Sequence, residues 1–273
     1  MTAPIKLVIS DVDGTLVTPE KVLTPAAQAA VHKLRAAGAA FTIISGRPPR
    51  GMAKLIGELA IDRPVAAFNG GSLANPDMSV IEAVRLSEDA ARAAISLLDR
   101  SGVQAWVYAD NAWFVRDLKG ARVDRESDTV GFGPTLTADF ESWMSRIDKV
   151  VGVSDDNALM GKVEAEAQSL LAGKATALRS QPYYLDVTHP DANKAHAVRT
   201  LSRRLSTPLE NIAVLGDMAN DISMLSLAGI GLSVAMGQSN DAVKAAAQMV
   251  TKANTEDGFA AAVEKIILPR ITA

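Results

Sequence analysis

The sequence contains no cysteine, which excludes disulfide bonds, a cysteine nucleophile and metal sites built from thiolates. It also contains no apolar run close to the roughly 18 residues that a membrane-spanning helix requires. No cluster of Lys and Arg stands out, and the sequence has 28 basic and 31 acidic residues, so nothing in it supports a nucleic-acid-binding surface. The segment from Met1 to Lys6 lacks the charged-then-apolar pattern of a signal peptide. We therefore expect a cytoplasmic protein that binds neither a membrane nor a nucleic acid.

The overall composition is that of a folded protein. Of the 273 residues, 48% are hydrophobic and 22% are charged, which excludes disorder and fibrous repeats. The chain is longer than the common domain size of about 100–150 residues, so it has room for one large domain or two modest ones.

Both ends of the chain alternate between strand and helix patterns. Ile5–Ile9 and Phe41–Ile44 are short apolar runs followed by polar residues, as is typical of strands buried on both faces of a parallel sheet. Between them, Thr24 followed by proline predicts the start of a helix, and Gly38 predicts its end. The buried-strand pattern returns at Ile212–Leu215. We expect the two ends to fold together around one parallel sheet.

The middle of the chain has a different character, because every tryptophan and tyrosine lies between residues 82 and 188. This segment predicts alternating strands together with helices at Glu88–Asp99, Ala138–Arg146 and Asn157–Leu171. We interpret residues 82–188 as a separate mixed α/β domain inserted into a discontinuous domain of residues 1–81 and 189–273. Its aromatic residues are expected to cover one sheet face, with Trp106, Tyr108 and Trp113 as packing residues rather than a substrate platform.

Polar side chains follow four of the predicted strands. In an open parallel sheet, ligands bind beyond the carboxyl ends of the strands, and two acidic clusters about 200 positions apart are predicted there. An aspartate after a strand is also a common helix cap or turn former, but two such pairs together favour a cation site. Carboxylate oxygens suit Mg²⁺. The residues at these strand ends are Asp11 with Asp13, Ser45, Asn69, and Asp217 with Asp221.

The segment Asp11-Val12-Asp13-Gly14-Thr15-Leu16 carries the most specific signal. It is not an EF-hand, because no glutamate closes a 12-residue loop. Two carboxylates spaced two residues apart on an extended strand end point to the same side, so one can attack as a nucleophile while the other handles a proton. Gly14 permits a tight turn beside an anion. A dehydrogenase is disfavoured, since no G-x-G-x-x-G follows the first strand.

This segment resembles the signature of the haloacid dehalogenase (HAD) superfamily of aspartate-nucleophile phosphotransferases. The resemblance extends to Ile44-Ser45-Gly46-Arg47, to Lys194 and to Gly216-Asp217-Met218-Ala219-Asn220-Asp221. The insertion resembles the C2 cap of the Cof-type (IIB) branch, and so does the tail, apart from Gly237-Gln238-Ser239, where many relatives have Gly-Asn-Ala. The resemblance implies an α/β fold: a Rossmann-like parallel-sheet core with an inserted α/β cap.

The same resemblance implies a set of catalytic roles. Asp11 attacks the phosphoryl group and becomes an aspartyl phosphate. Asp13 protonates the leaving oxygen and then activates water, for which we expect a raised pKa of its carboxyl group near the other carboxylates. Ser45 and Lys194 bind the phosphoryl oxygens, and the ammonium group also offsets the charge between nucleophile and substrate.

The metal ligands implied by the resemblance are oxygen atoms of the two acidic clusters. The carboxylates of Asp11 and Asp217 and the main-chain carbonyl of Asp13 are predicted to hold Mg²⁺. Asn220 and Asp221 are predicted to complete and orient this shell.

The predicted substrate contacts lie on neighbouring loops. Gly46 and Arg47 follow the phosphoryl-binding serine, although the arginine fits a salt bridge equally well. Asn69 ends a strand before two glycines, and His189 lies where the inserted segment rejoins the core. By contrast, His32 and His196 are expected to be structural.

These predictions point to a Mg²⁺-dependent phosphatase acting on a small phosphorylated metabolite, a sugar phosphate or similar phosphomonoester. Two alternatives share the same residues: a phosphomutase-like phosphotransferase on a hexose phosphate, and a non-catalytic phosphate-binding regulator. The sequence does not identify the substrate, because the inserted segment contains no recognisable motif.

Overall fold

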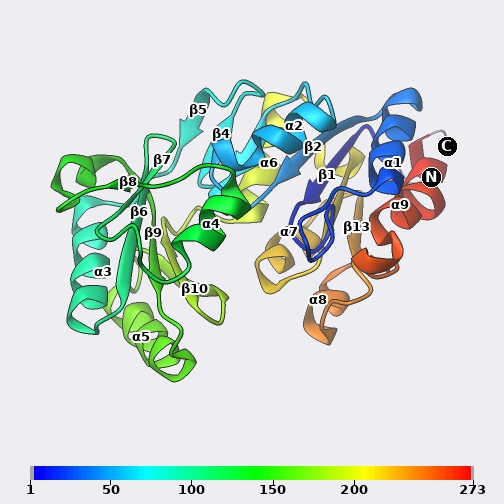
Figure 1. Ribbon diagram of the computed structural model, residues 1–273. Coiled ribbons are helices and arrows are strands. Elements are labelled where there is room, and N and C mark those ends of the chain that lie inside the picture. The colour runs from blue at the N-terminus through cyan, green and yellow to red at the C-terminus, as the bar shows by residue number, and fades with distance from the viewer. Residues whose placement is uncertain (1–2, 272–273) are drawn as a thin grey trace.

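The computed structural model describes residues 3–271, and its strands form two sheets in two lobes (Figure 1). In the larger lobe an eight-stranded sheet has the order β14-β13-β12-β1-β2-β3-β4-β5. In the smaller lobe a six-stranded sheet has the order β10-β11-β9-β6-β7-β8. The first and the last of the described residues lie in the larger lobe, so the smaller sheet is inserted between two halves of the larger one.

Six neighbouring strands of the larger sheet, from β14 to β3, are parallel, and β4 and β5 extend it as an antiparallel meander. These last two strands were not anticipated from the sequence, because each is at most four residues long. The predicted domain boundary at residue 82 falls inside β5. The strands are β1 (Leu7–Asp11), β2 (Ala40–Ile44), β3 (Val65–Ala67), β4 (Ser72–Ala74), β5 (Val80–Ala83), β12 (Ile212–Gly216), β13 (Leu232–Ala235) and β14 (Met249–Val250).

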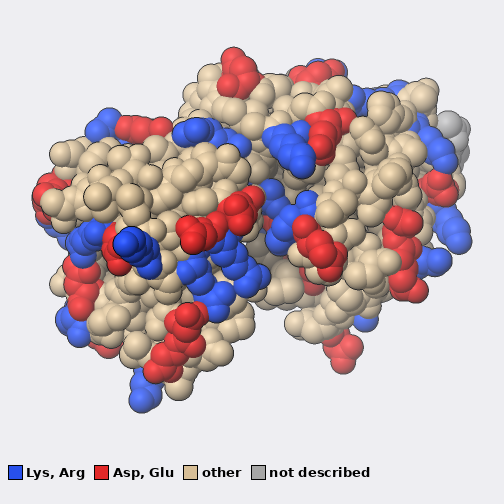
Figure 2. Space-filling model, viewed as in Figure 1, with Lys and Arg blue, Asp and Glu red and all other residues tan. Residues whose placement is uncertain are grey.

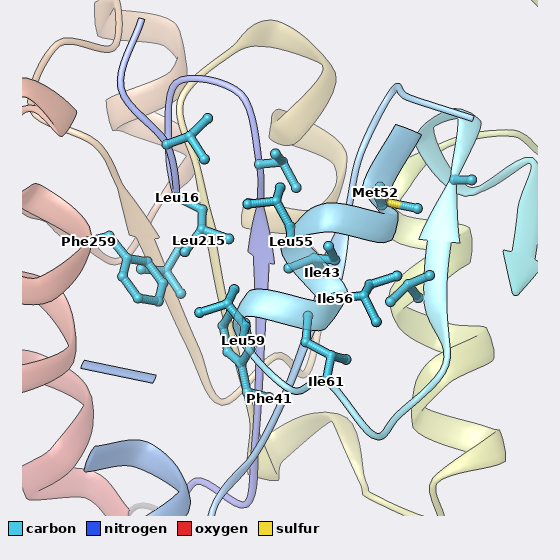
Figure 3. Packing of buried hydrophobic residues seen from close by; sticks show 14 of the residues in the cluster. Leu16, Phe41, Ile43, Met52, Leu55, Ile56, Leu59, Ile61, Leu215 and Phe259 are labelled. Atoms are coloured by element: carbon cyan, nitrogen blue, oxygen red, sulfur yellow. The ribbon is translucent and has the colours of Figure 1, made fainter. Parts of the chain in front are cut away.

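Helices cover both faces of this sheet, which explains why its central strands are apolar throughout. On one face, leucine and isoleucine side chains of α2 pack towards Phe41, Ile43 and Leu215 of the sheet (Figure 3). On the other face, Leu7 and Ile9 pack with residues of α6, α7 and α8. The helices of this lobe are α1 (Pro25–Ala36), α2 (Ala53–Glu58), α6 (Lys194–Arg204), α7 (Ile222–Leu225), α8 (Asp241–Ala246), α9 (Gly258–Ala262) and α10 (Leu268–Ile271).

The helix starts follow from local capping chemistry. The Thr24 hydroxyl accepts a hydrogen bond from the Ala27 amide at 3.1 Å, as predicted for the start of α1. At α6, the Asn193 side chain accepts one from the His196 amide at 2.9 Å. This cap makes Lys194 the first residue of α6, at the carboxyl edge of the sheet.

In the smaller lobe, α3 and α5 pack on one face of the sheet. The opposite face carries Trp106, Tyr108 and Trp113, which belong to the same apolar cluster as Met52 and Phe68 of the larger lobe. These rings therefore pack between the two lobes. The elements are α3 (Glu88–Arg100), β6 (Gln104–Ala109), β7 (Ala112–Val115), α4 (Val123–Val130), β8 (Thr135–Leu136), β9 (Ile147–Val153), α5 (Asn157–Leu170), β10 (Thr176–Gln181) and β11 (Tyr184–Thr188).

Several sequence predictions were wrong in detail. Trp143 lies on the other face of the small sheet, where its ring centroid is 4.1 Å from that of Phe114. The predicted helix Ala138–Arg146 is a 3₁₀ turn over Glu141–Arg146. The polar helix α4 was missed, because every residue between its two terminal valines is polar, which leaves no apolar stripe along the helix. Within residues 3–271, no helix has both the length and the apolar character needed to cross a membrane.

Candidate active site

Acidic residues from two strand ends meet at the carboxyl edge of the larger sheet. β1 ends at Asp11, and Asp217 directly follows its parallel neighbour β12, so both project from the same edge. One oxygen each of Asp11, Asp217 and Asp221 lies within 4.8 Å of the others, and all three residues are buried. The structure thus brings together acidic residues about 200 positions apart in the sequence.

Lys194 joins two of these carboxylates. Its Nζ donates to Oδ1 of Asp11 and to Oδ1 of Asp221, each at 2.5 Å, and its side chain is fully buried. Burial by itself lowers the pKa of Lys194, but the two carboxylates outweigh burial and raise that pKa. The ammonium group is therefore charged and fixed beside Asp11.

The three carboxylates carry more negative charge than Lys194 neutralises. Burial raises the pKa of Asp11 well above its usual value, and although Lys194 opposes this, Asp221 and Asp217 add to it. Burial and Asp221 likewise raise the pKa of Asp217 to about 6. When all three are ionised, two negative charges are left without a partner among these four residues, as suits a divalent cation.

Gly14 lets the Asp217 carboxylate approach the motif loop. Its φ of 92° favours glycine, and a Cβ atom at this position would collide with Asp217 Oδ2. The Thr15 hydroxyl donates to Asp217 Oδ1 at 3.2 Å, so the loop also orients this carboxylate. Close packing and hard oxygen donors fit Mg²⁺.

Asp221 and Asn220 shape the second acidic loop. Oδ2 of Asp221 accepts hydrogen bonds from the amides of Asp217 and Met218, at 2.8 and 2.9 Å. Since its other oxygen binds Lys194, this carboxylate orients its neighbours. Asn220 donates from Nδ2 to Oδ1 of Asn69 at 3.0 Å, which links this loop to the end of β3.

Asp13 forms ion pairs with two basic side chains, Arg47 and Lys21. Arg47 donates from Nε and Nη2 to the two oxygens of Asp13 at 2.9 and 2.6 Å, and Lys21 Nζ lies 2.8 Å from Oδ1. Burial raises the pKa of Asp13, but these contacts outweigh burial and lower it to about 2. The expected raised pKa was wrong, because sequence spacing reveals neighbouring carboxylates but not the cations that fold against them. Lys21 was not identified from the sequence.

The loop after β2 gathers most of the predicted substrate contacts. Ser45 is buried, its hydroxyl accepts from the Arg47 amide at 3.1 Å, and its carbonyl accepts from the Asn69 amide at 2.8 Å. Gly46 lies against Asn69, whose Nδ2 would be 3.4 Å from an added Cβ. His189, in contrast, accepts a hydrogen bond within its own loop, from the Asp191 amide at 3.1 Å.

Comparison with known proteins identifies the family of this chain. The family model for haloacid dehalogenase-like hydrolases matches residues 8–263. The chain belongs to the haloacid dehalogenase-like hydrolase family. This match confirms the HAD Cof-type resemblance, the α/β fold class and the hydrolase class, and relatives that match this chain are named phosphatases.

Relatives of this HAD protein match over nearly its whole length. A pyridoxal phosphate phosphatase from Escherichia coli is 28% identical over 265 residues, covering 93% of this chain and 96% of the relative. A 5-amino-6-(5-phospho-D-ribitylamino)uracil phosphatase from Bacillus subtilis is 26% identical, covering 97% and 96%. Among solved structures, a haloacid dehalogenase-like hydrolase from Bacteroides thetaiotaomicron has a TM-score of 0.87 at 26% identity, covering 96% of this chain and 99% of that one.

The HAD site also faces residues of the smaller lobe that sequence reasoning did not select. Lys149 Nζ donates to the Gly46 carbonyl at 3.4 Å and lies 3.5 Å from Asp186 Oδ2. The Tyr108 hydroxyl donates to Glu126 Oε1 at 2.8 Å. These residues sit at alternating strand positions or on the unpredicted helix α4, and no motif marks them.

Proposed function

We propose that this HAD protein is a Mg²⁺-dependent phosphatase that hydrolyses a small phosphorylated metabolite through an aspartyl-phosphate intermediate. We take residues 1–81 and 189–273 as the catalytic core and residues 82–188 as the cap. The observation that carries the proposal is the bonding of buried Lys194 to both Asp11 and Asp221, with Asp217 alongside. An ammonium group at this position neutralises the repulsion between an attacking carboxylate and an anionic phosphate.

In the first half-reaction, an Asp11 oxygen forms a bond to phosphorus while the bond to the leaving-group oxygen breaks. Ser45 and Lys194 hold the phosphoryl oxygens, and Asp13 gives a proton to the leaving oxygen. Arg47 and Lys21 keep the Asp13 carboxyl group ionised in the free protein. The approaching phosphate has to compete with Asp13 for these two cations, and this competition raises the pKa of Asp13 so that it can carry a proton.

In the second half-reaction, Asp13 takes a proton from water, whose oxygen then attacks the phosphorus atom. The bond between phosphorus and Asp11 breaks, which releases inorganic phosphate and restores the carboxylate. Exclusion of bulk water by the cap protects the phosphoenzyme until this step.

The residues present fit the proposed Mg²⁺. Asp11, Asp217 and the Asp13 carbonyl are the proposed ligands, with Asn220 and Asp221 orienting them. When bound, the ion supplies positive charge to the phosphoryl oxygens. The close packing of Asp217 against Gly14 and the excess of negative charge support this assignment.

The surface around the site suits a phosphate ester. Figure 2 shows Lys and Arg side chains gathered beside the hollow between the two lobes, with acidic side chains next to them. Positive charge at a cleft attracts small anions. The phosphatases named above act on phosphorylated small molecules, which supports a sugar phosphate or similar phosphomonoester as the substrate.

Phosphate release from a panel of phosphomonoesters, with and without Mg²⁺, tests this proposal. We expect Mg²⁺-dependent release by the wild type and a loss of about 10³-fold or more in Asp11→Asn, with an unchanged circular dichroism spectrum. Asp62→Asn, a change of the same type at an exposed residue, is the control and should keep full activity.

Substantial activity in Asp11→Asn would contradict the nucleophile assignment. If no ester in the panel releases phosphate, isomerisation that depends on a bisphosphate activator would indicate the phosphomutase alternative, and phosphate binding without turnover would indicate a regulator.

A further inference from the structure

Four loops leave the carboxyl edge of the core sheet beside one another, after the neighbouring parallel strands β14, β13, β12 and β1. The loops after β1 and β12 carry the acidic motifs of the site. The loop after β13 contains Gly237-Gln238-Ser239, the segment in which the tail of the sequence differs from the Cof-type pattern. Its glutamine, Gln238, connects the other three loops.

Both ends of the Gln238 amide group are hydrogen-bonded. Its Nε2 donates to the Gly14 carbonyl at 2.6 Å, and its Oε1 accepts from the Asn254 amide at 3.0 Å. A carbonyl only accepts and a main-chain N–H only donates, so these two partners fix the orientation of the amide group. The contact with Gly14 joins loops that are not neighbours, because β12 lies between β13 and β1 in the sheet. Although the side chain is exposed, both its polar atoms are therefore held.

Gln238 also contacts the loop between these two, at the Asp217 carboxylate. This carboxylate accepts a hydrogen bond from the Thr15 hydroxyl at 3.2 Å and is hydrogen-bonded by the Gln238 side chain as well. An amide nitrogen carries two hydrogens, so it can donate to the Gly14 carbonyl and to a carboxylate. The orientation of Asp217 thus depends on side chains from two different loops.

The segment after β14 supports Gln238. Asn254 is buried, and besides its main-chain bond to Gln238, its Nδ2 donates to the Val17 carbonyl at 3.0 Å. Both Gly14 and Val17 belong to the loop after β1, so two amide side chains hold this loop at two points. A side chain that is anchored by its own partners can fix the groups that it contacts.

The groups that Gln238 contacts belong to the proposed metal site. Gly14 directly follows Asp13, whose carbonyl is one proposed Mg²⁺ ligand, and the Asp217 carboxylate is another. Residues that hydrogen-bond to metal ligands orient them and typically change metal affinity about 10–100-fold. Gln238 carries no charge and its Oε1 already accepts from Asn254, so it acts on the ligands rather than on the ion.

We propose that Gln238 is a positioning residue of the metal site, which holds the Gly14 carbonyl and the Asp217 carboxylate in the arrangement that binds Mg²⁺. This inference rests on the proposed phosphatase function. It goes further by assigning part of the Mg²⁺ affinity to a neutral side chain outside the acidic motifs.

The test measures Mg²⁺ binding without substrate, through the rise of the thermal unfolding midpoint (Tm) with Mg²⁺ concentration above its value in EDTA. Gln238→Met keeps the length of the side chain but removes both hydrogen-bonding groups. We expect this variant to bind Mg²⁺ about tenfold more weakly than the wild type, with an unchanged circular dichroism spectrum. In turnover, the Mg²⁺ concentration for half-maximal activity should rise by a similar factor, with a smaller effect on kcat at saturating Mg²⁺.

Gln248→Met is the matched control. Gln248 is also an exposed glutamine whose Nε2 donates to a main-chain carbonyl, that of Ile230, at 3.3 Å. Ile230 precedes β13, so this contact lies at the amino edge of the sheet, away from the acidic loops. We expect the variant to keep the Mg²⁺ affinity of the wild type, even if its Tm in EDTA is lower.

If Gln238→Met binds Mg²⁺ as tightly as the wild type, the glutamine only supports the fold and the inference is wrong, whereas the proposed function stands. The inference is also wrong if Gln248→Met weakens Mg²⁺ binding to the same extent, because the loss then does not depend on the site. A wild type whose Tm does not respond to Mg²⁺ and which hydrolyses no phosphomonoester would contradict the proposed function, and this inference with it.

Discussion

The two sides of the cleft hold their polar groups in different ways. At the carboxyl edge of the core sheet, Lys194 makes two hydrogen bonds of 2.5 Å, and Asp221 uses both its oxygens within the protein. On the face of the small sheet that packs towards the larger lobe, Lys149 reaches its two oxygen neighbours only at 3.4 and 3.5 Å. The core groups are preorganised by their own contacts, whereas the contacts of Lys149 are longer than charge-assisted hydrogen bonds of the usual length, about 2.7–2.9 Å.

The difference has a structural cause. The core residues stand where the main chain itself is fixed, at the end of β1, directly after β12 and at the first turn of α6. Groups placed by strand ends and helix starts move little, which suits reaction chemistry. Lys149 and Asp186 reach their positions only through side-chain alternation along β9 and β11, where substitutions alter the cleft without altering the backbone.

The largest effect should come from removing the tightest contacts on the core side. Lys194→Met leaves the buried Asp11 and Asp221 without their cation. We expect kcat/KM to fall about 10²–10³-fold and the free energy of unfolding to fall by about 3–5 kcal/mol. Steady-state kinetics and urea unfolding measure the two losses, and exposed Lys265→Met serves as control. Comparable activity in the two variants would show that the core contacts are no more important than surface ones.

An intermediate effect is expected within the smaller lobe, at Asp148 beside Lys149. Its side chain is 8% exposed and its Oδ1 lies 3.4 Å from Arg85 Nε. Burial outweighs this arginine and raises the pKa of Asp148 to about 6. The folded protein thus holds this proton more tightly than the unfolded chain, so the contribution of Asp148 to stability falls as pH rises from about 4 to about 6.

Asp148→Asn should remove this pH dependence. Between pH 4 and 7, the free energy of unfolding of the wild type should fall by about 2 kcal/mol relative to that of the variant. Urea unfolding at several pH values measures the difference, with exposed Asp62→Asn as control. Parallel curves for wild type and Asp148→Asn would contradict the raised pKa.

The smallest expected effect concerns the fit of the core loop around Asp217. Gly14 and Gly38 both have a φ of 92°, but an added Cβ collides with Asp217 only at Gly14 and meets nothing within 4 Å at Gly38. Both alanine variants should lose about 1 kcal/mol of stability through backbone strain. Only Gly14→Ala should also raise the Mg²⁺ concentration for half-maximal activity, by about tenfold. Equal Mg²⁺ dependence in both variants would show that the close approach of Gly14 to Asp217 does not affect Mg²⁺ binding.

The sequence predicted the parts of the molecule in which local pattern and position coincide. Apolar runs located the central strands, Thr24 located the start of α1, and the polar residues after β1 and β12 indicated one shared edge. Prediction failed where the signal was short or polar, as for the strands β4 and β5 and the helix α4. It also failed for the pKa of Asp13, which depends on Arg47 and Lys21.

The sequence by itself therefore determined the parallel core, the inserted segment and the acidic motifs, because strand periodicity and strand-end residues are local properties of the chain. Only the tertiary structure decided which charges neighbour one another: Lys194 between Asp11 and Asp221, Arg47 on Asp13, and Lys149 against the Gly46 loop. Such pairings join residues that are far apart in the sequence. They depend on how the two lobes and their loops pack, which no local pattern records.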